Sequence, residues 1–180
     1  MTDKTPVEIE RKWIVKGWPE KQLPQLFTEI MRQGYISVHP TVRIREENTV
    51  ASMDDKHPCK DIFVLCFKSS GRLSRKEIEI EVSREKFNQL EDLMGLPLIR
   101  KQRTTYLLAD GHHLEVNYVD EGLPSAFFYA EIEFASEEEA NAFQPESVGL
   151  EEYLCHDVTY QKGQSMAAHW QSTSVKEENA

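Results

Sequence analysis

The sequence has few cysteines and no long apolar run. Its three cysteines, Cys59, Cys66 and Cys155, are an odd number without Cys-x-x-Cys spacing, so they predict neither a disulfide framework nor a thiolate metal cage. The longest apolar run, residues 62–67, is far shorter than a membrane span. The first seven residues contain no apolar stretch of the kind found in secretion signals. We therefore expect a cytoplasmic protein without a membrane partner.

The chain also lacks an excess of positive charge. It has 21 Lys and Arg against 31 Asp and Glu, a net charge of -10, which argues against nucleic acid as a partner. Of its 180 residues, 39% are hydrophobic and 29% are charged, which is typical of a globular protein. The length predicts one domain, over residues 1–170, followed by a polar, disordered tail over residues 171–180.

Alternation with a period of two dominates the sequence. In residues 7–14, it places Glu8, Glu10 and Lys12 on one face of a strand and apolar side chains on the other. Similar or weaker alternation predicts seven more strands, over residues 33–38, 42–45, 63–68, 75–82, 99–108, 114–117 and 129–134. Eight strands are enough to close a barrel of modest bore.

Helical signals are fewer and lie between the strands. Apolar spacing predicts a helix over Glu20–Arg32, and Ser83 and Gly95 mark the start and stop of a helix over residues 84–94. Ser136 and Glu139 form a capping-box pattern for a short helix up to residue 143. A last helix is expected over residues 162–170, and residues 49–61 are expected to be a long polar connection.

The charged positions are segregated by sign. Like-charged pairs two residues apart are 8/10, 77/79 and 131/133 (Glu) and 43/45 and 101/103 (Arg or Lys). Alternation ordinarily means a sheet with one face in water, but a face built only for solubility would mix the signs. If the charged faces instead converge, the carboxylates could bind Mg²⁺ or Mn²⁺, and the cations could bind a polyphosphate.

Several motifs, taken in order, resemble those of one family. Glu8-Ile-Glu-Arg-Lys12 resembles the ExExK signature of the CYTH, or triphosphate tunnel metalloenzyme, superfamily, in the form found in its short single-domain prokaryotic inorganic triphosphatases. The likeness continues at residues 33–35, 42–45, 67–71, 74–79, 100–103, 114–115, 130–134, 157 and 160, and covers about residues 7–168.

The resemblance implies an α+β fold, namely a closed antiparallel eight-stranded β-barrel with a polar interior and helices packed outside. It implies a hydrolase that uses metal-activated water to convert inorganic triphosphate to pyrophosphate and phosphate. The implied metal ligands, for Mg²⁺ or Mn²⁺, are Glu8, Glu10, Glu77, Glu79, Glu131 and Glu133. The implied phosphate-binding residues are Lys12, Arg43, Arg45, Lys68, Arg75, Lys101 and Arg103.

The resemblance also assigns catalytic roles to Lys12 and Tyr35, the latter as a proton acceptor, and it implies that Asp157 braces one tunnel mouth. An ordinary tyrosine pKa near 10 makes a poor base, so simple packing is the competing interpretation of Tyr35. Asn117 stands where the family commonly has Asp, and Lys162 replaces a usual Asn.

Other functions stay open at this point. The alternatives are a thiamine or nucleoside triphosphatase, a class IV adenylyl cyclase, and a polyphosphate- or nucleotide-binding module without turnover. The cyclase branch tends to carry a His-Phe pair shortly before ExExK, and this chain has none there. The expected partner is a small-molecule triphosphate, and a homodimer stays open beside a monomer.

Overall fold

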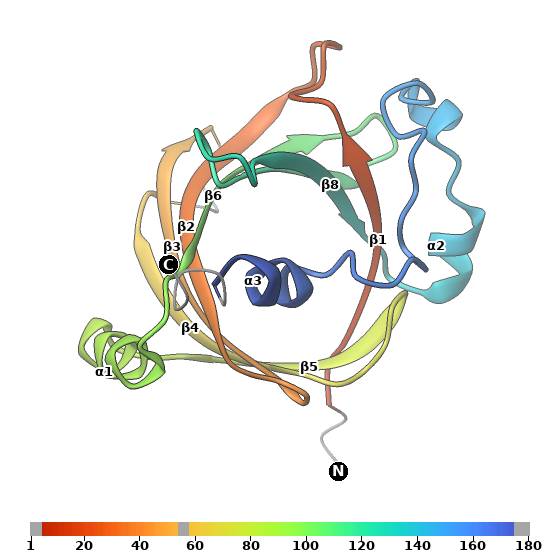
Figure 1. The fold of residues 1–180 in the computed structure, drawn as a ribbon. Coiled ribbons are helices and arrows are strands. Elements are labelled where there is room, and N and C mark those ends of the chain that lie inside the picture. The colour runs from red at the N-terminus through yellow and green to blue at the C-terminus, as the bar shows by residue number, and fades with distance from the viewer. Residues whose placement is uncertain (1–4, 54–57, 175–180) are drawn as a thin grey trace.

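A closed antiparallel barrel forms the body of the protein (Figure 1). The structure, a computed structural model, describes residues 5–53 and 58–174. The strand order around the barrel is β1-β5-β4-β3-β2-β6-β7-β8, and β8 pairs again with β1. The strands are β1 (Val7–Val15), β2 (Gln25–Val38), β3 (Thr41–Ser52), β4 (Asp61–Lys68), β5 (Ser74–Glu81), β6 (Ile99–Leu107), β7 (His113–Val119) and β8 (Phe127–Glu133). The expected fold is confirmed.

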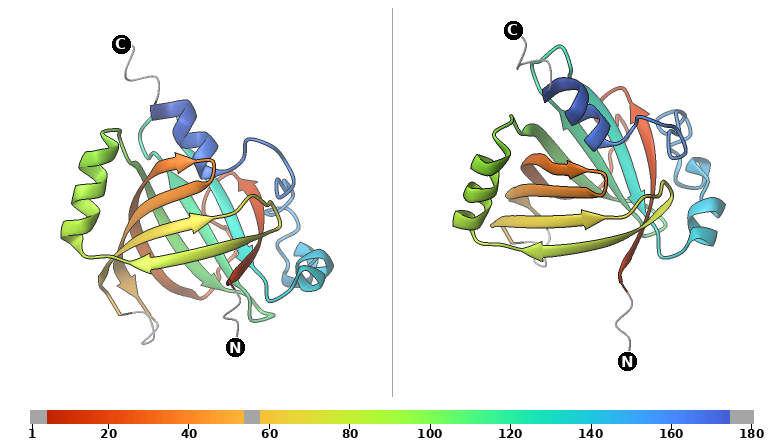
Figure 2. Two further views of the ribbon diagram at one scale, coloured as in Figure 1. Left: turned by 90° about the horizontal axis from the view of Figure 1, so that it is seen from below. Right: turned by 60° about the horizontal axis from the view of Figure 1, so that its bottom comes forward.

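Helices pack around this wall. They are α1 (Arg84–Met94), α2 (Glu137–Ala142), the 3-10 helix η1 (Pro145–Val148) and α3 (Met166–Ser174). Figure 2 shows α1 and α2 on opposite sides of the barrel and α3 at one end. As predicted, the Ser83 hydroxyl caps α1 by accepting from the Lys86 amide, and Gly95 ends α1 with a φ of 65°. Within the described residues, none of the helices has the length and apolar composition that a membrane crossing requires.

The largest apolar cluster lies outside the barrel wall. Trp13 and Ile132 are fully buried between the outer faces of β1 and β8 and the chain that follows β8. A second cluster places Phe87 of α1 against Phe63 of β4. At Gly34 on β2, an added Cβ would lie 2.5 Å from Cδ2 of Leu98 and 2.7 Å from Cε of Met94, so α1 and the residues after it pack closely on this position, and these side-chain ends would have to shift. Stability therefore rests on the outer faces, which leaves the inner faces free for polar residues.

The helix predicted over Glu20–Arg32 is wrong, because most of that segment belongs to β2. The strand forms ladders with both β3 and β6, so its backbone groups are satisfied on both edges. A register shift between Thr28 and Glu29 disturbs the alternation, and α1 covers part of the outer face. Pro24, which is unfavourable inside a helix, is the sequence signal against the helical interpretation.

Two other boundaries differ from expectation. The polar connection begins only after β3, which extends to Ser52, and residues 54–57 of that connection lie outside the described part of the chain. The last helix begins at Met166 and not at residue 162. It ends at Ser174, so residues 171–174 of the expected tail are helical. The remaining tail, residues 175–180, lies outside the described residues.

Asp157 lies on the outer side of the wall and does not brace a tunnel mouth. It precedes α3 by nine residues and forms a β-bridge with Trp13. Its Oδ2 accepts from Nη2 of Arg11 at 2.6 Å, and its Oδ1 accepts from the Thr159 amide at 2.8 Å. Arg11 points outward because it alternates with Glu10 and Lys12. The pair therefore anchors the C-terminal segment to β1.

We expect Asp157→Asn to lower the free energy of unfolding by about 1 kcal/mol at pH 7, because it removes a partly exposed ion pair. Burial alone would raise the pKa of Asp157, but hydrogen bonds from Thr159 and Arg11 outweigh it and lower the pKa below 3.8. The carboxylate therefore stabilises the fold above that pH, and its contribution is lost as the pH falls further. Urea unfolding at pH 7 and pH 3 measures the difference in free energy of unfolding between the wild type and Asp157→Asn, which should be smaller at pH 3.

The matched control is Asp92→Asn, an exposed change on α1. If both variants lost equal stability at both pH values, the anchoring role of Asp157 would be refuted.

Candidate functional site

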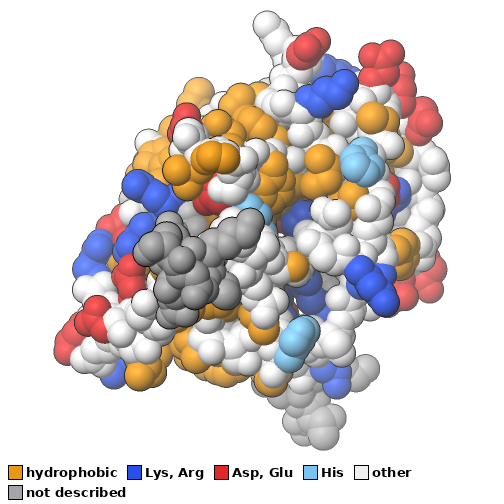
Figure 3. Space-filling view, viewed as in Figure 1, with side chains coloured by type: hydrophobic (Ala, Val, Ile, Leu, Met, Phe, Trp, Pro, Cys, Tyr) orange, Lys and Arg blue, Asp and Glu red, His pale blue; other side chains and the backbone are white. Residues whose placement is uncertain are grey.

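The inner faces of the strands surround a cavity of about 1360 Å³. Each residue that the sequence assigned to the site lines this cavity. Nine Lys and Arg and seven Glu line it in total, so the lumen is cationic although the whole chain carries a charge of -10. Figure 3 shows Lys and Arg side chains within an opening on the face seen in Figure 1. The charged faces therefore converge, and the alternative of a sheet with a wet polar face is excluded.

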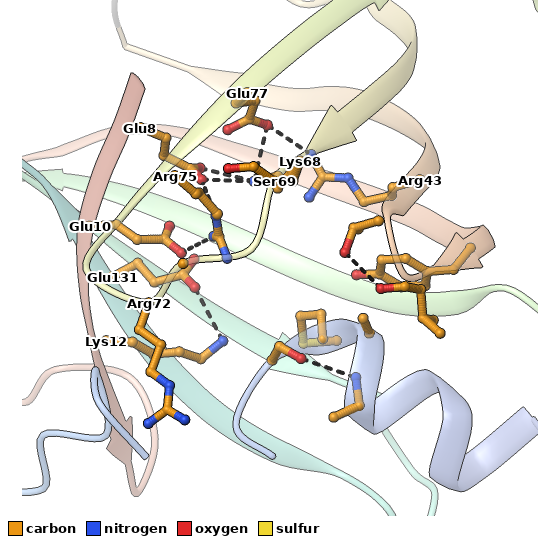
Figure 4. Close-up of a pocket in the computed structure, with 18 of the residues that line it drawn as sticks. Glu8, Glu10, Lys12, Arg43, Lys68, Ser69, Arg72, Arg75, Glu77 and Glu131 are labelled. Atoms are coloured by element: carbon orange, nitrogen blue, oxygen red, sulfur yellow. Dashed lines mark hydrogen bonds and ion pairs between the residues drawn. The ribbon is translucent and has the colours of Figure 1, made fainter. Parts of the chain in front are cut away.

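Strand β1 contributes carboxylates that share two cations from the β4–β5 hairpin (Figure 4). Nζ of Lys68 contacts Oε1 of Glu8 and Oε1 of Glu77, each at 3.0 Å. Nε of Arg75 donates to Oε2 of Glu8 at 2.6 Å, and its Nη2 contacts Glu10. The β4–β5 hairpin is far from β1 in the sequence, and the antiparallel pairing of β5 with β1 brings these side chains together.

The β1–β8 register places further charges next to these. Lys12 lies opposite Glu131, and Nζ of Lys12 donates to Oε1 of Glu131 at 3.2 Å. Burial alone would raise the pKa of Glu131, but the charges of Lys12, Lys101 and Arg103 outweigh it and lower the pKa to about 2. Nζ of Lys101 donates to the phenol oxygen of Tyr129 at 2.9 Å, and burial, with the charge of Arg103, lowers the pKa of Lys101.

The negative charges of Glu10 and Glu133 are less fully balanced by neighbouring cations. The two residues lie opposite each other in the β1–β8 register, and among the described residues the side chain of Glu133 has neither an ion pair nor a hydrogen bond. Burial first, and then Glu131 and Glu8, raise the pKa of Glu10 to about 7 despite the contact with Arg75. Burial, together with the charges of Glu8, Glu115 and Glu77, also raises the pKa of Glu133. The carboxylates here repel one another, and a bound cation would relieve that repulsion.

These residues fit a hard divalent cation. The ligands available around Glu10 and Glu133 are carboxylate oxygens, which suit Mg²⁺ or Mn²⁺ better than Zn²⁺. A second group joins Cys66, Glu77 and Glu79, whose ligand atoms lie within 4.8 Å of one another. Arg43 already neutralises both of those carboxylates, at 3.7 Å from Glu77 and 3.2 Å from Glu79. The β1–β8 carboxylates are therefore the better candidates for metal ligands.

The opposite wall is strongly cationic. Arg45 contacts Glu79 at 3.2 Å and also contacts Glu47. Arg103 contacts Glu115 at 3.0 Å and donates through Nε to the Asn117 side-chain oxygen at 3.3 Å. Nε of Arg43 is buried and has no hydrogen-bond partner within the described part of the chain. A buried donor without an acceptor is costly. Arg43 as a whole lines the cavity, where its guanidinium could bind a phosphate oxygen.

The phenol of Tyr35 lies at one end of the lumen. Its oxygen accepts from Nε2 of Gln33 at 2.9 Å, and its ring packs on Trp170 of α3. Burial raises the pKa of Tyr35 to about 12, although Arg43 and Arg45 act in the lowering direction. A proton acceptor needs the opposite shift, so the electrostatics oppose that role at neutral pH.

Several lining residues were not assigned to the site by the sequence analysis, among them Gln33, Cys66, Arg72, Glu115, Tyr129 and Lys162. Gln33, Cys66 and Tyr129 each lie two positions before an assigned residue, so the same alternation could have found them. Cys66 donates through Sγ to Glu77 at 2.9 Å, and burial raises the pKa of its thiol to about 12. Arg72 lies in a hairpin, where no periodicity applies.

We expect Glu10→Gln to stabilise the metal-free protein by about 2 kcal/mol at pH 8. The folded-state pKa of Glu10, about 7, is above its ordinary value of 4.5, so the folded protein loses stability as the pH rises between these values. An amide cannot ionise and avoids this loss. Urea unfolding in EDTA at pH 8 and pH 4 measures the difference in free energy of unfolding between the wild type and Glu10→Gln, which should disappear at pH 4.

Glu85→Gln, an exposed change on α1, is the control. A wild type that is at least as stable as Glu10→Gln at pH 8 would contradict the crowding of carboxylates around Glu10.

Comparisons with known proteins agree with this geometry, although no family model matches the chain. The inorganic triphosphatase of Nitrosomonas europaea is 32% identical over 142 residues, which are 77% of this chain and 83% of that protein. A solved structure of an inorganic triphosphatase has a TM-score of 0.54 at 25% identity, over 89% of this chain and 92% of that one. A Hippeastrum adenylyl cyclase candidate, described as having a dominant triphosphatase activity, shares the fold, with a TM-score of 0.56 at 16% identity over 93% and 96% of the two chains. The chain belongs to the inorganic triphosphatases of the CYTH superfamily.

Proposed function

We propose that this protein hydrolyses inorganic triphosphate to pyrophosphate and phosphate, with Mg²⁺ or Mn²⁺ held by carboxylates of β1 and β8. The observation that carries the proposal is a lumen inside the closed barrel in which cations outnumber carboxylates. Within it, the negative charges of Glu10 and Glu133 are not fully balanced by cations. A highly anionic substrate together with a divalent cation complements both features. The three free cysteines agree with a reducing, cytoplasmic setting.

The lumen residues bind and position the substrate. Arg43, Arg45 and Arg103 present planar guanidinium groups that can exchange a carboxylate partner for phosphate oxygens. Lys12 and Lys68 add compact charges beside the carboxylates that would hold the metal. A bound divalent cation would supply a water of lowered pKa and neutralise phosphoryl oxygens. Because donors are fixed by the barrel wall, they need no rearrangement as charge develops on the leaving group.

Incubation with tripolyphosphate, ATP and thiamine triphosphate, each with Mg²⁺ and then with Mn²⁺, tests the activity. We expect pyrophosphate and phosphate from tripolyphosphate, with the highest kcat/KM of the three substrates. Glu133→Gln should reduce kcat/KM by at least about 100-fold, because it removes a charged metal ligand without disturbing an existing ion pair. Products are identified by phosphorus NMR or ion chromatography.

Glu138→Gln, an exposed change on α2, should retain wild-type turnover. Cyclic AMP as the main product from ATP would overturn the proposal, as would wild-type activity of Glu133→Gln.

Tyr35→Phe separates the two interpretations of that residue. Because the pKa is already about 12, we expect kcat to fall by less than about tenfold, with an unchanged pH profile. Tyr118→Phe is the control, since Tyr118 stacks on Phe128 and does not line the cavity. A loss of about 100-fold, together with loss of the ascending limb of the pH profile, would instead support proton acceptance.

A further inference from the structure

Two cations at one mouth of the lumen lie outside its network of ion pairs. Arg72 belongs to the hairpin between β4 and β5, and Lys162 belongs to the segment that precedes α3. Both side chains line the cavity, and both residues are exposed. They are 90 residues apart in the sequence, and the C-terminal segment brings them to the same cavity.

Within residues 5–53 and 58–174, neither Arg72 nor Lys162 forms an ion pair. The cations deeper in the cavity mostly do, since carboxylates contact Lys12, Arg43, Arg45, Lys68, Arg75 and Arg103. The exception, Lys101, is deeply buried and is hydrogen-bonded to Tyr129. Arg72 and Lys162 can therefore bind an anion without first giving up a carboxylate.

Arg72 is also positioned by the fold. Its guanidinium donates through Nη1 to the carbonyl oxygen of Tyr160, so it bridges the hairpin and the C-terminal segment. Figure 4 shows its side chain on the same side of the cavity as Lys12 and Glu131. A guanidinium carries five N–H donors, so this one contact leaves most of them available for a ligand.

We propose that Arg72 and Lys162 form an entrance subsite that binds the outer phosphoryl group of the substrate. The subsite selects a chain with free phosphates at both ends over a nucleoside triphosphate, which has a free phosphate at one end only; this rests on the function proposed above. A terminal phosphoryl group carries a charge of about -1.5 to -2 near neutral pH. The α-phosphoryl group of a nucleotide carries less, because it is bonded both to the nucleoside and to the next phosphate. Because charged side chains line the inner lumen, we expect a nucleoside to stay at the mouth, where it would take the place of the second free phosphate.

The test compares Arg72→Gln, Lys162→Gln and the double variant, with Mg²⁺ present, on tripolyphosphate and on ATP as a substrate or competitive inhibitor. For tripolyphosphate, each single variant should raise KM about fivefold, as expected for one exposed charge contact, with kcat within about twofold. For ATP, KM or Ki should change by less than about twofold, so the preference for tripolyphosphate falls. Arg72→Lys should restore part of the loss.

Lys76→Gln is the matched control, because Lys76 carries the same charge on the same hairpin but does not line the cavity. The subsite would be refuted if KM changed equally for both substrates, or if Lys76→Gln had as large an effect. A change in kcat and melting temperature alone would refute it too. Failure of the wild type to hydrolyse tripolyphosphate would instead refute the proposed function. In that case the Kd for tripolyphosphate, measured by calorimetry, tests the subsite. Equal affinity of the wild type and the double variant would refute it.

Discussion

The constraint on which this structure depends is the enclosure of many charges within one wall of strands. Removing a charge from water is expensive unless a partner compensates it. The lumen meets this requirement by placing Glu and Lys or Arg on neighbouring strands, as with Lys12 and Glu131 or Arg75 and Glu8. Where the compensation is incomplete, at Glu10 and Glu133, the pKa is raised. Those positions are where a cation has most to contribute.

The barrel is consequently inverted with respect to an ordinary globular core. Its apolar clusters lie between the outer faces of the strands and the helices or the C-terminal segment, as Trp13 and Phe87 illustrate. The α3 end is the exception, since Trp170 packs there against Tyr35. This arrangement separates the residues that stabilise the fold from those that line the lumen. A protein of this kind can keep electrostatic repulsion in its site because the stabilising contacts are elsewhere.

Most of the site could be predicted because it lies on strands. Period-two alternation puts Glu8, Glu10 and Lys12 on one face whatever the partner strand is, and the same holds for Arg43 and Arg45. The family resemblance then supplied the closure of the barrel, which periodicity alone left open. The helix expected over residues 20–32 was wrong because β2 is covered on part of its outer face and contains a register shift, so its pattern lost the strand signature.

The sequence by itself determined which side chains share a face, because that depends only on the geometry of an extended chain. It also determined that the charges were segregated by sign. Only the tertiary structure decided that these faces point inward, that Glu10 lies opposite Glu133, and that Asp157 anchors the outside of β1. It alone brought Arg72 and Lys162 to the same mouth. Strand register and loop placement depend on contacts between residues distant in sequence, and local periodicity carries no information about those contacts.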